Sequence, residues 1–83
     1  MAEKKPIGEV THYYDKIGVA VVKFSKAVEV GDEIQFKGTH TDFNQKINSM
    51  QYDHKSIEKA KKGEEVGMKV EDKVKEGDKV FGV

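Results

Sequence analysis

Apolar residues recur at every second position over most of the chain, a spacing typical of β-strands with one buried face. Segment 18–24 is apolar at both parities, so we expect it to be a central strand covered on both faces. The stretch Asp15 to Gly18 separates it from segment 7–14, and its glycine favours a tight turn, which predicts a hairpin. Together the alternation predicts six strands, at 7–14, 18–24, 33–37, 43–52, 65–70 and 79–83.

The alternation also assigns inward-facing side chains. In segment 7–14 the inward set is Val10, His12 and Tyr14, so we expect His12 to be a partly buried, hydrogen-bonded histidine. In the other strands the predicted inward residues are Ala20, Val22, Phe24, Ile34, Phe36, Val66, Met68 and Val70.

Segment 43–52 changes parity along its length. Phe43 and Ile47 share one parity, whereas Met50 and Tyr52 share the other. A strand that keeps one face buried needs an extra residue to make this change, so we predict a β-bulge or a strong bend near Asn48-Ser49. Such a bend lets a strand turn the corner of a small barrel.

One segment has a helical pattern. In 55–62, Ser56 could cap a helix, Ile57 and Ala60 are three residues apart, and Gly63 could end it. The segment is too short to be stable alone, so we expect one helical turn or an irregular loop.

A Val-x-x-Gly-Asp-x-(Ile/Val) pattern occurs at Val28 and again 46 residues later at Val74. In both copies Gly-Asp comes just before a short alternating strand. Glycine can adopt positive φ, and aspartate can accept hydrogen bonds from nearby backbone amides. We therefore interpret the repeat as one turn used twice, in which Val28 and Val74 plug the core.

These elements predict an all-β protein. A small sheet buries its apolar face best by closing on itself, so we favour a six-stranded, mostly antiparallel closed β-barrel with at most one short helical turn. Residues 1–6 are predicted to be a flexible tail and residues 7–83 the barrel.

Composition narrows the functional classes. The 83 residues suffice for one domain, the 15 basic and 15 acidic residues cancel, and arginine is absent. Without cysteine, neither disulfides nor thiolate zinc sites can form. There is no apolar run of roughly 20 residues to span a membrane, and the charged start MAEKKP is no signal peptide. We expect a cytoplasmic monomer.

The order and spacing of several motifs resemble the second domain of translational GTPases, the elongation-factor β-barrel. A closer resemblance is to the small elongation-factor-like barrel found alone or at the C-terminus of U32 peptidase-like proteins, where a DF-x-Q-x-(I/V)-x-SMQ motif is typical. The matching stretches are GEVTHYYDKIGVAVVKF at 8–24, VEVGDEIQFKG at 28–38, DFNQKINSMQ at 42–51, A-x-x-G-x-x-V-G at 60–67 and EGDKV at 76–80.

The motifs of a GTPase motor are missing. The chain has no G-x-x-x-x-G-K-(S/T) loop to hold a nucleotide phosphate and no N-K-x-D. The stretch Asp15 to Gly18 matches D-x-x-G formally, but we interpret it as the hairpin turn. We therefore expect no nucleotide and no other cofactor.

No catalytic or metal site can be assembled from the sequence, so we expect no enzymatic activity. The serines, Ser25, Ser49 and Ser56, lie outside nucleophile-elbow motifs. The histidines, His12, His40 and His54, lack the spacing of metal ligands. Because the barrel of U32-type proteins is an appendage, the resemblance brings no peptidase chemistry with it.

A cluster of lysines is the candidate binding surface. It could meet phosphate, with an aromatic ring beside it for stacking, although a solvated face balanced by Glu58, Glu64 and Glu65 is also consistent with it. The absence of arginine disfavours specific nucleic-acid reading. Two functions stay open: a module contacting tRNA, ribosomal RNA or a translation-related protein, and an accessory protein-interaction domain for a U32 peptidase-like or other larger partner. The candidate residues are Tyr13, Lys46, His54, Lys55, Lys59, Lys61 and Lys62.

Overall fold

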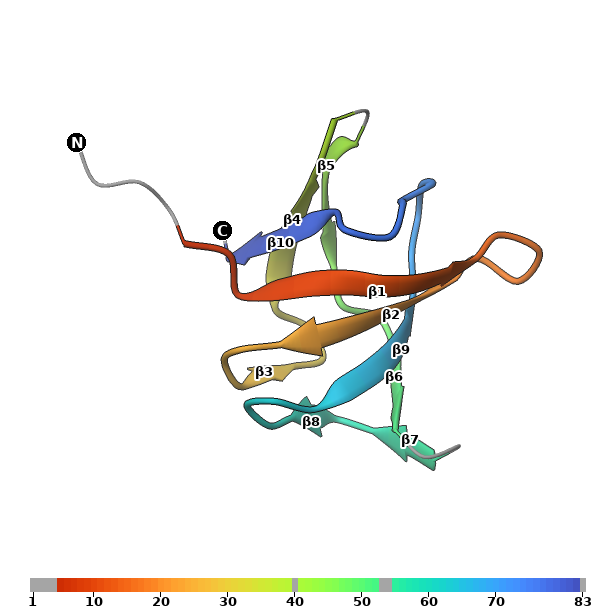
Figure 1. Cartoon of the computed structure of the whole chain (residues 1–83). Coiled ribbons are helices and arrows are strands. Elements are labelled where there is room, and N and C mark those ends of the chain that lie inside the picture. Colours follow the sequence, from red (N-terminus) through yellow and green to blue (C-terminus); the bar gives the residue numbers. More distant parts are fainter. Residues whose placement is uncertain (1–4, 40, 53–54, 83) are drawn as a thin grey trace.

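The computed structural model describes residues 5–39, 41–52 and 55–82. Within these residues all helical or extended secondary structure is β-strand. No helix in the described residues could cross a membrane. Eight strands form one antiparallel sheet in the order β5-β4-β10-β1-β2-β9-β6-β7, and β3 pairs with β8 in a second sheet (Figure 1). The strands are β1 Gly8–Tyr14, β2 Val19–Phe24, β3 Val28–Glu29, β4 Glu33–Lys37, β5 Asp42–Lys46, β6 Met50–Tyr52, β7 Lys55–Ile57, β8 Lys59–Ala60, β9 Glu65–Lys69 and β10 Lys79–Gly82.

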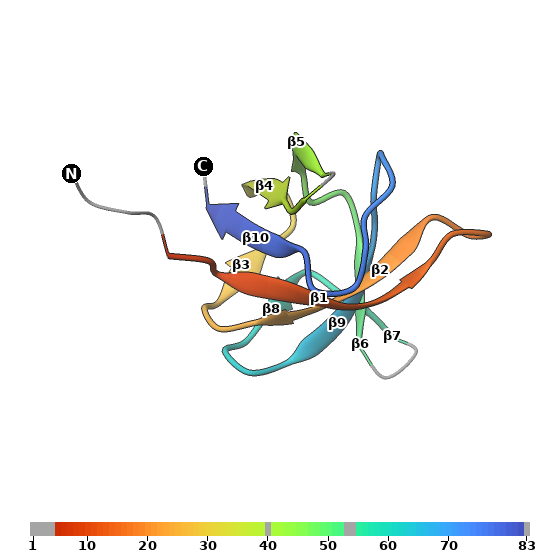
Figure 2. The ribbon, with the colours of Figure 1, turned by 45° about the horizontal axis from the view of Figure 1, so that its top comes forward.

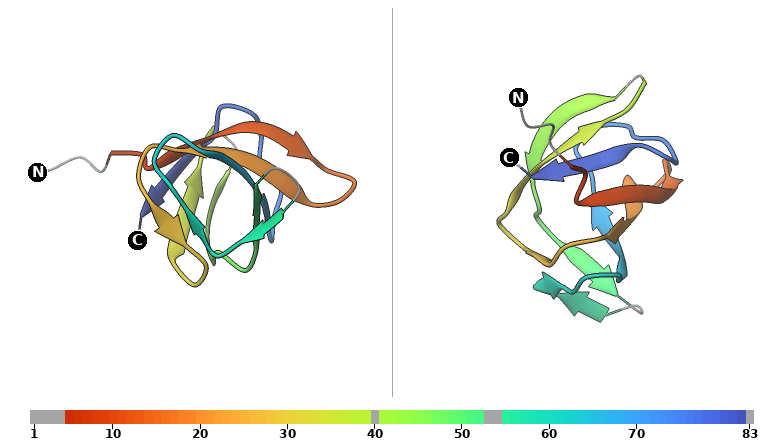
Figure 3. Two further views of the ribbon diagram at one scale, coloured as in Figure 1. Left: turned by 90° about the horizontal axis from the view of Figure 1, so that it is seen from below. Right: turned by 60° about the vertical axis from the view of Figure 1, so that its left-hand side comes forward.

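The all-β prediction is confirmed, but the closed six-stranded barrel is wrong. The main sheet curls into an open half-barrel whose edge strands β5 and β7 do not pair with each other (Figures 2 and 3). The physical reason lies in segment 42–52, which forms β5 at one edge of the sheet and β6 next to the other edge. The chain between Lys46 and Met50 therefore connects the β5 side of the sheet to the β6 side. In a closed barrel, a ladder of main-chain hydrogen bonds would join these two sides.

The side chain of Gln45 also bridges this opening. Its Nε2 donates to the carbonyl of Lys69 at 3.0 Å, and its Oε1 accepts from the N–H of Glu71 at 2.8 Å. The side-chain amide of this β5 residue thus forms one donor and one acceptor hydrogen bond with the main chain at the end of β9. A neighbouring strand would form the same kind of bonds. Gln45 is 4% exposed, so both bonds are partly shielded from competing water.

The core lies inside the curve of the half-barrel. The predicted inward faces of β2, β4 and β9 are confirmed, and the half-buried Val19 and Val21 on the outer face of β2 agree with a central strand. The buried apolar residues are Val10, Ala20, Val22, Phe24, Val28, Ile34, Phe36, Ile47, Met50, Ala60, Val66, Met68, Val70, Val74 and Val80.

A β-bulge in β1 overturns part of the first predicted face. The register with β2 shifts between Val10 and His12, so Thr11 is the extra residue. A bulge reverses the alternation beyond it. Tyr13 therefore packs against the core, while His12 and Tyr14 are exposed with their rings stacked at 6.5 Å. The predictions of an inward Tyr14 and a partly buried His12 are wrong.

The predicted change of parity near Asn48-Ser49 is present. Strand β5 ends at Lys46, and β6 begins at Met50, so residues 47–49 absorb the change by interrupting the strand. Met50 is buried, but Tyr52 is 43% exposed. Its predicted inward position is wrong because β6 ends at Tyr52, beyond the edge of the core.

The helical turn predicted within 55–62 is also wrong, because this segment forms β7 and β8. Ile57 pairs with Met50 in the main sheet, and Ala60 pairs with Val28 in the small sheet. A bend at Glu58 separates the two strands, and its carbonyl accepts from the N–H of Val30 at 2.8 Å. Two pairing partners explain the three-residue spacing that resembled a helix.

The first copy of the Val-x-x-Gly-Asp repeat forms the predicted turn. Gly31 has φ +99°, and the Asp32 carboxylate accepts from the N–H of Glu29 at 2.9 Å. The N–H of Asp32 donates to the carbonyl of Glu29 at 3.1 Å, which closes the turn. Val28 is buried, as predicted.

The second copy has the same geometry. Gly77 has φ +92°, and the Asp78 carboxylate accepts from the N–H of Lys75 at 2.8 Å. Here the aspartate is itself buried and also accepts from the Thr41 hydroxyl. Val74 is buried. The prediction of one turn used twice is confirmed.

The structure contains a third copy that the sequence pattern conceals, because glutamate replaces aspartate and alanine replaces valine. Gly63 has φ +87°, and Glu64 Oε1 accepts from the N–H of Lys61 at 2.6 Å. The N–H of Glu64 donates to the carbonyl of Lys61 at 3.1 Å, and Ala60 is buried. The longer side chain of glutamate reaches the same amide that aspartate reaches in the other copies.

All three turns attach to a neighbouring segment in the same way. The glycine N–H donates to the carbonyl of one residue, and the N–H of that residue donates back to the carbonyl of the acidic residue of the turn, at 2.7–3.1 Å. The residues receiving the turns are Ile47, Val10 and Phe24 for the first, second and third copies. The repeat is therefore a device for fixing a turn to a strand, and its third use shapes the site described next.

Candidate functional site: a pocket beside the third turn

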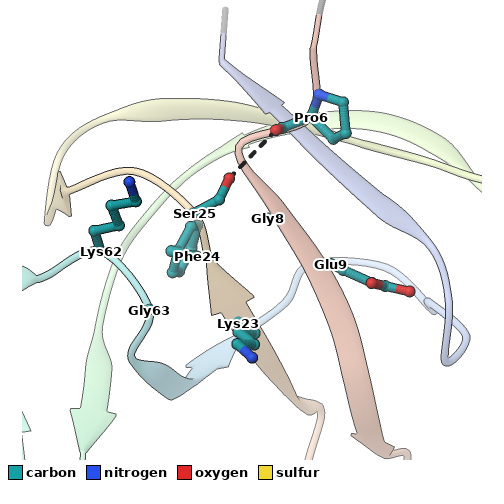
Figure 4. Close-up of a pocket in the computed structure, with 8 residues that line it drawn as sticks. All are labelled: Pro6, Gly8, Glu9, Lys23, Phe24, Ser25, Lys62 and Gly63. Atoms are coloured by element: carbon teal, nitrogen blue, oxygen red, sulfur yellow. Dashed lines mark hydrogen bonds between the residues drawn. The ribbon is translucent and has the colours of Figure 1, made fainter.

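A pocket of about 330 Å³ opens where the start of β1, the end of β2 and the third turn meet (Figure 4). We call it the Phe24 pocket. Its wall is mostly apolar, and charged groups lie around it, a composition typical of small ligand and side-chain binding sites. Its lining comprises Pro6, Gly8, Glu9, Lys23, Phe24, Ser25, Lys62 and Gly63.

Main-chain hydrogen bonds hold the walls of the Phe24 pocket together. The N–H of Gly63 donates to the carbonyl of Phe24 at 2.7 Å, which fixes the third turn to β2. On the other side, the N–H of Ser25 donates to the carbonyl of Ile7 at 2.8 Å, and its hydroxyl reaches the carbonyl of Pro6 at 3.5 Å (Figure 4). The pocket is therefore formed in the free protein.

Close packing under the pocket favours glycine at position 8. A Cβ on Gly8 would lie 3.0 Å from Phe24 Cδ1 and 3.0 Å from Val22 Cγ1, which is tighter than ordinary contact. Phe24 is fully buried, so its ring lies beneath the surface of the pocket, packed with little freedom to adjust.

Lys23 brings a positive charge that forms no ion pair with a described residue. Its cross-strand partners are Glu9 on β1 and Glu65 on β9. The Glu9 carboxylate lies 3.2 Å from the Lys79 ammonium, and Glu65 accepts from the Thr11 hydroxyl at 3.3 Å. Among the described residues, no carboxylate oxygen lies within 4.0 Å of the Lys23 ammonium.

Lys62 supplies the second ammonium group from the third turn. Figure 4 shows Lys62 and Lys23 on different sides of Phe24, with Glu9 on the neighbouring strand. In the described part of the chain, Lys62 also has no carboxylate oxygen within 4.0 Å. Two exposed lysines that form no ion pair within the described residues therefore flank the pocket, and the acidic residue of its lining, Glu9, pairs with Lys79.

The structure separates the residues that the sequence grouped as one surface. Of the predicted set, Lys62 alone lines the Phe24 pocket, and His54 lies outside the described residues. Lys59 and Lys61 line a different pocket beside Val28, where Lys59 lies 3.9 Å from the Glu29 carboxylate.

The other predicted residues lie on three further strands. Lys46 ends β5 and Lys55 begins β7, so they belong to opposite edge strands of the main sheet. Tyr13 on β1 lines a separate pocket of about 540 Å³ together with Lys73 and Lys75. That pocket has a more polar wall than the Phe24 pocket.

The sequence did not predict most of the Phe24 pocket, because its lining comes from three segments that are distant in the chain, 6–9, 23–25 and 62–63. One signal was available: Ala60 to Glu64 matches Val-x-x-Gly-Asp once alanine is allowed at its first position and glutamate at its last. In the described residues, no three His, Cys, Asp or Glu side chains are grouped closely enough to hold a metal ion.

Comparison with known proteins supports one of the two resemblances. No family model matches the chain. An uncharacterized protease of Methanocaldococcus jannaschii is 40% identical over 79 residues, which cover 94% of this chain and 19% of that protein. A collagenase of Porphyromonas gingivalis is 32% identical over 81 residues, which cover 95% of this chain and 22% of the collagenase. The chain thus spans about a fifth of the length of these relatives.

A solved structure agrees. The C-terminal domain of a Geobacillus thermoleovorans protein classed with the U32 peptidases superposes with a TM-score of 0.88 at 22% identity, covering 94% of this chain and 99% of that domain. None of these proteins is named as a translation factor, so the comparisons leave that resemblance without support. The chain therefore has the fold of the C-terminal domain of a U32 peptidase-class protein.

Proposed function

We propose that this chain is a non-catalytic accessory domain that makes protein contacts for a larger U32 peptidase-like partner. The observation that carries this proposal is the pattern of coverage. Nearly the whole chain matches the relatives named as a protease and a collagenase, yet it corresponds to only 19% and 22% of their lengths. Most of each relative lies outside the match, with ample room for the catalytic groups.

The geometry supports a contact-making role. The Phe24 pocket is preformed, and the edge strands β5 and β7 have one side free of pairing within the described sheet. Pockets and unpaired strand edges are surfaces through which domains bind protein segments. Contact with RNA stays a prediction without a supporting relative. Those of its predicted residues that the structure describes line separate pockets or lie on opposite edge strands of the main sheet.

The test uses the Porphyromonas collagenase, of which 81 residues match this chain. Three forms are compared for cleavage of gelatin: the whole enzyme, a form lacking the matched region, and a chimera in which this chain replaces that region. We expect the deletion to lower the rate by about tenfold or more, a loss of about 1.4 kcal/mol or more in transition-state stabilisation, and the chimera to restore it.

This chain alone serves as the control and is expected to cleave nothing. Cleavage by the isolated chain would contradict a non-catalytic role. A deletion form as active as the whole enzyme, or a chimera as weak as the deletion, would contradict the accessory role.

A further inference from the structure

We infer that the Phe24 pocket binds an acidic peptide segment, with one apolar side chain in the pocket and carboxylates beside it meeting Lys23 and Lys62. This inference rests on the proposed function, which makes the partner a protein. It adds which surface of the chain binds that partner and which residue types the partner presents. The volume of about 330 Å³ is sufficient for one large side chain.

The mostly apolar wall selects the anchor. Pro6 and the Cα of Gly63 present carbon at a mostly apolar wall, so an aliphatic or aromatic side chain gains by leaving water there. No Cβ lies on Gly63, and a built one would have no atom within 4 Å, so this wall is open to an approaching chain.

Charge complementarity selects the flanking residues. The two cross-strand carboxylates that could neutralise Lys23 are directed to Lys79 and to Thr11 instead. Lys62 extends from the third turn on another side of the pocket (Figure 4). A peptide with carboxylates on both sides of its apolar residue places opposite charge near both ammonium groups, which favours encounter and fixes the register.

The same features disfavour RNA as the occupant. A base needs an exposed aromatic face on which to stack, but Phe24 is fully buried and the lining offers no other aromatic ring. Arginine, which would hold phosphate with two hydrogen bonds, is absent from the chain.

The experiment is a titration of the ¹⁵N-labelled chain with three acetylated, amidated peptides, EELEE, QQLQQ and EEAEE, at concentrations up to about 1 mM. We expect EELEE to shift the amides of Gly8, Ser25 and Gly63. QQLQQ lacks the charges and EEAEE lacks the anchor, so both are expected to bind at least about fivefold more weakly.

Two charge reversals provide the matched comparison. Lys62→Glu is expected to weaken EELEE binding at least about fivefold, whereas Lys37→Glu, an exposed lysine outside the pocket lining, is expected to change it less than about twofold. Unchanged amide spectra away from position 62 show that the variant is folded.

The inference is overturned by no shifts with EELEE, by equal binding of QQLQQ, or by shifts outside the pocket. Bulk tRNA that shifts the same amides at lower concentration than the peptide would also overturn it. The collagenase chimera separates the two proposals. A fully active chimera carrying Lys62→Glu supports the accessory role without the pocket. Peptide binding together with an inactive chimera supports the pocket without the accessory role.

Discussion

Replacing Gln45 by leucine tests whether this side chain links the two sides of the open half-barrel. Leucine has a similar volume but no polar atoms, so it removes both the donor to the Lys69 carbonyl and the acceptor for the Glu71 N–H. Both main-chain groups then lose a partner near a side chain that is only 4% exposed.

The magnitude follows from these two bonds. Each hydrogen bond contributes about 0.5–1.5 kcal/mol, and a group left unsatisfied costs about 1–3 kcal/mol instead. Because Lys69 and Glu71 are themselves exposed residues, water can reach part of the gap, and the lower half of the range applies. We expect Gln45→Leu to lower the free energy of unfolding by about 2–4 kcal/mol, out of about 4–12 kcal/mol for a chain of this length.

The assay is urea unfolding followed by circular dichroism, with amide hydrogen exchange as a local measurement. The Glu71 amide, which donates to Gln45, should exchange faster in the variant. Gln51→Leu is the control, because Gln51 is exposed and has no side-chain hydrogen bond among those of the described residues; it should change stability by less than about 0.5 kcal/mol. Equal stabilities for Gln45→Leu and Gln51→Leu would refute the bridging role of this side chain.

Three further predictions concern the repeated turn. Alanine at Gly31, Gly63 or Gly77 should cost about 1–2 kcal/mol in each case, since φ is positive and no atom crowds the new Cβ; thermal unfolding of the three variants should give similar losses, and widely different ones would mean that the turns are not equivalent. Asp78→Ala should cost about 2–4 kcal/mol by urea unfolding, because the buried carboxylate accepts two hydrogen bonds, and a loss below 1 kcal/mol would contradict this. Gly38→Ala should be destabilising by about 1–3 kcal/mol, since its Cβ would lie 2.0 Å from Asp78 Oδ1, and an unchanged melting temperature would show that Asp78 moves freely.

The sequence predicts the strands well where one face is uniformly apolar. Ile34 and Phe36 alternate with polar residues, and both are fully buried on β4. It fails at Thr11, because a bulge is a single extra residue that leaves no mark on composition yet reverses every position after it. Gln45 carried a usable signal: it is a polar residue at inward parity between Phe43 and Ile47.

Closure and the pocket could not be predicted in the same way. The number of strands in a sheet depends on which distant segments pair, and segment 42–52 contributes to both ends of the strand order. The Phe24 pocket likewise combines residues from 6–9, 23–25 and 62–63, which come together only through tertiary hydrogen bonds. Lys62 was predicted as a binding residue from charge alone, and the reason it lines the pocket, the third turn, became visible only in the structure.

The most direct measurement of the proposed role is a titration of the ¹⁵N-labelled chain with the Porphyromonas collagenase that lacks the matched region. We expect the amides of Gly8, Ser25 and Gly63 to lose intensity first, as the larger protein docks at the Phe24 pocket. A spectrum that stays unchanged at stoichiometric addition of this protein would contradict it.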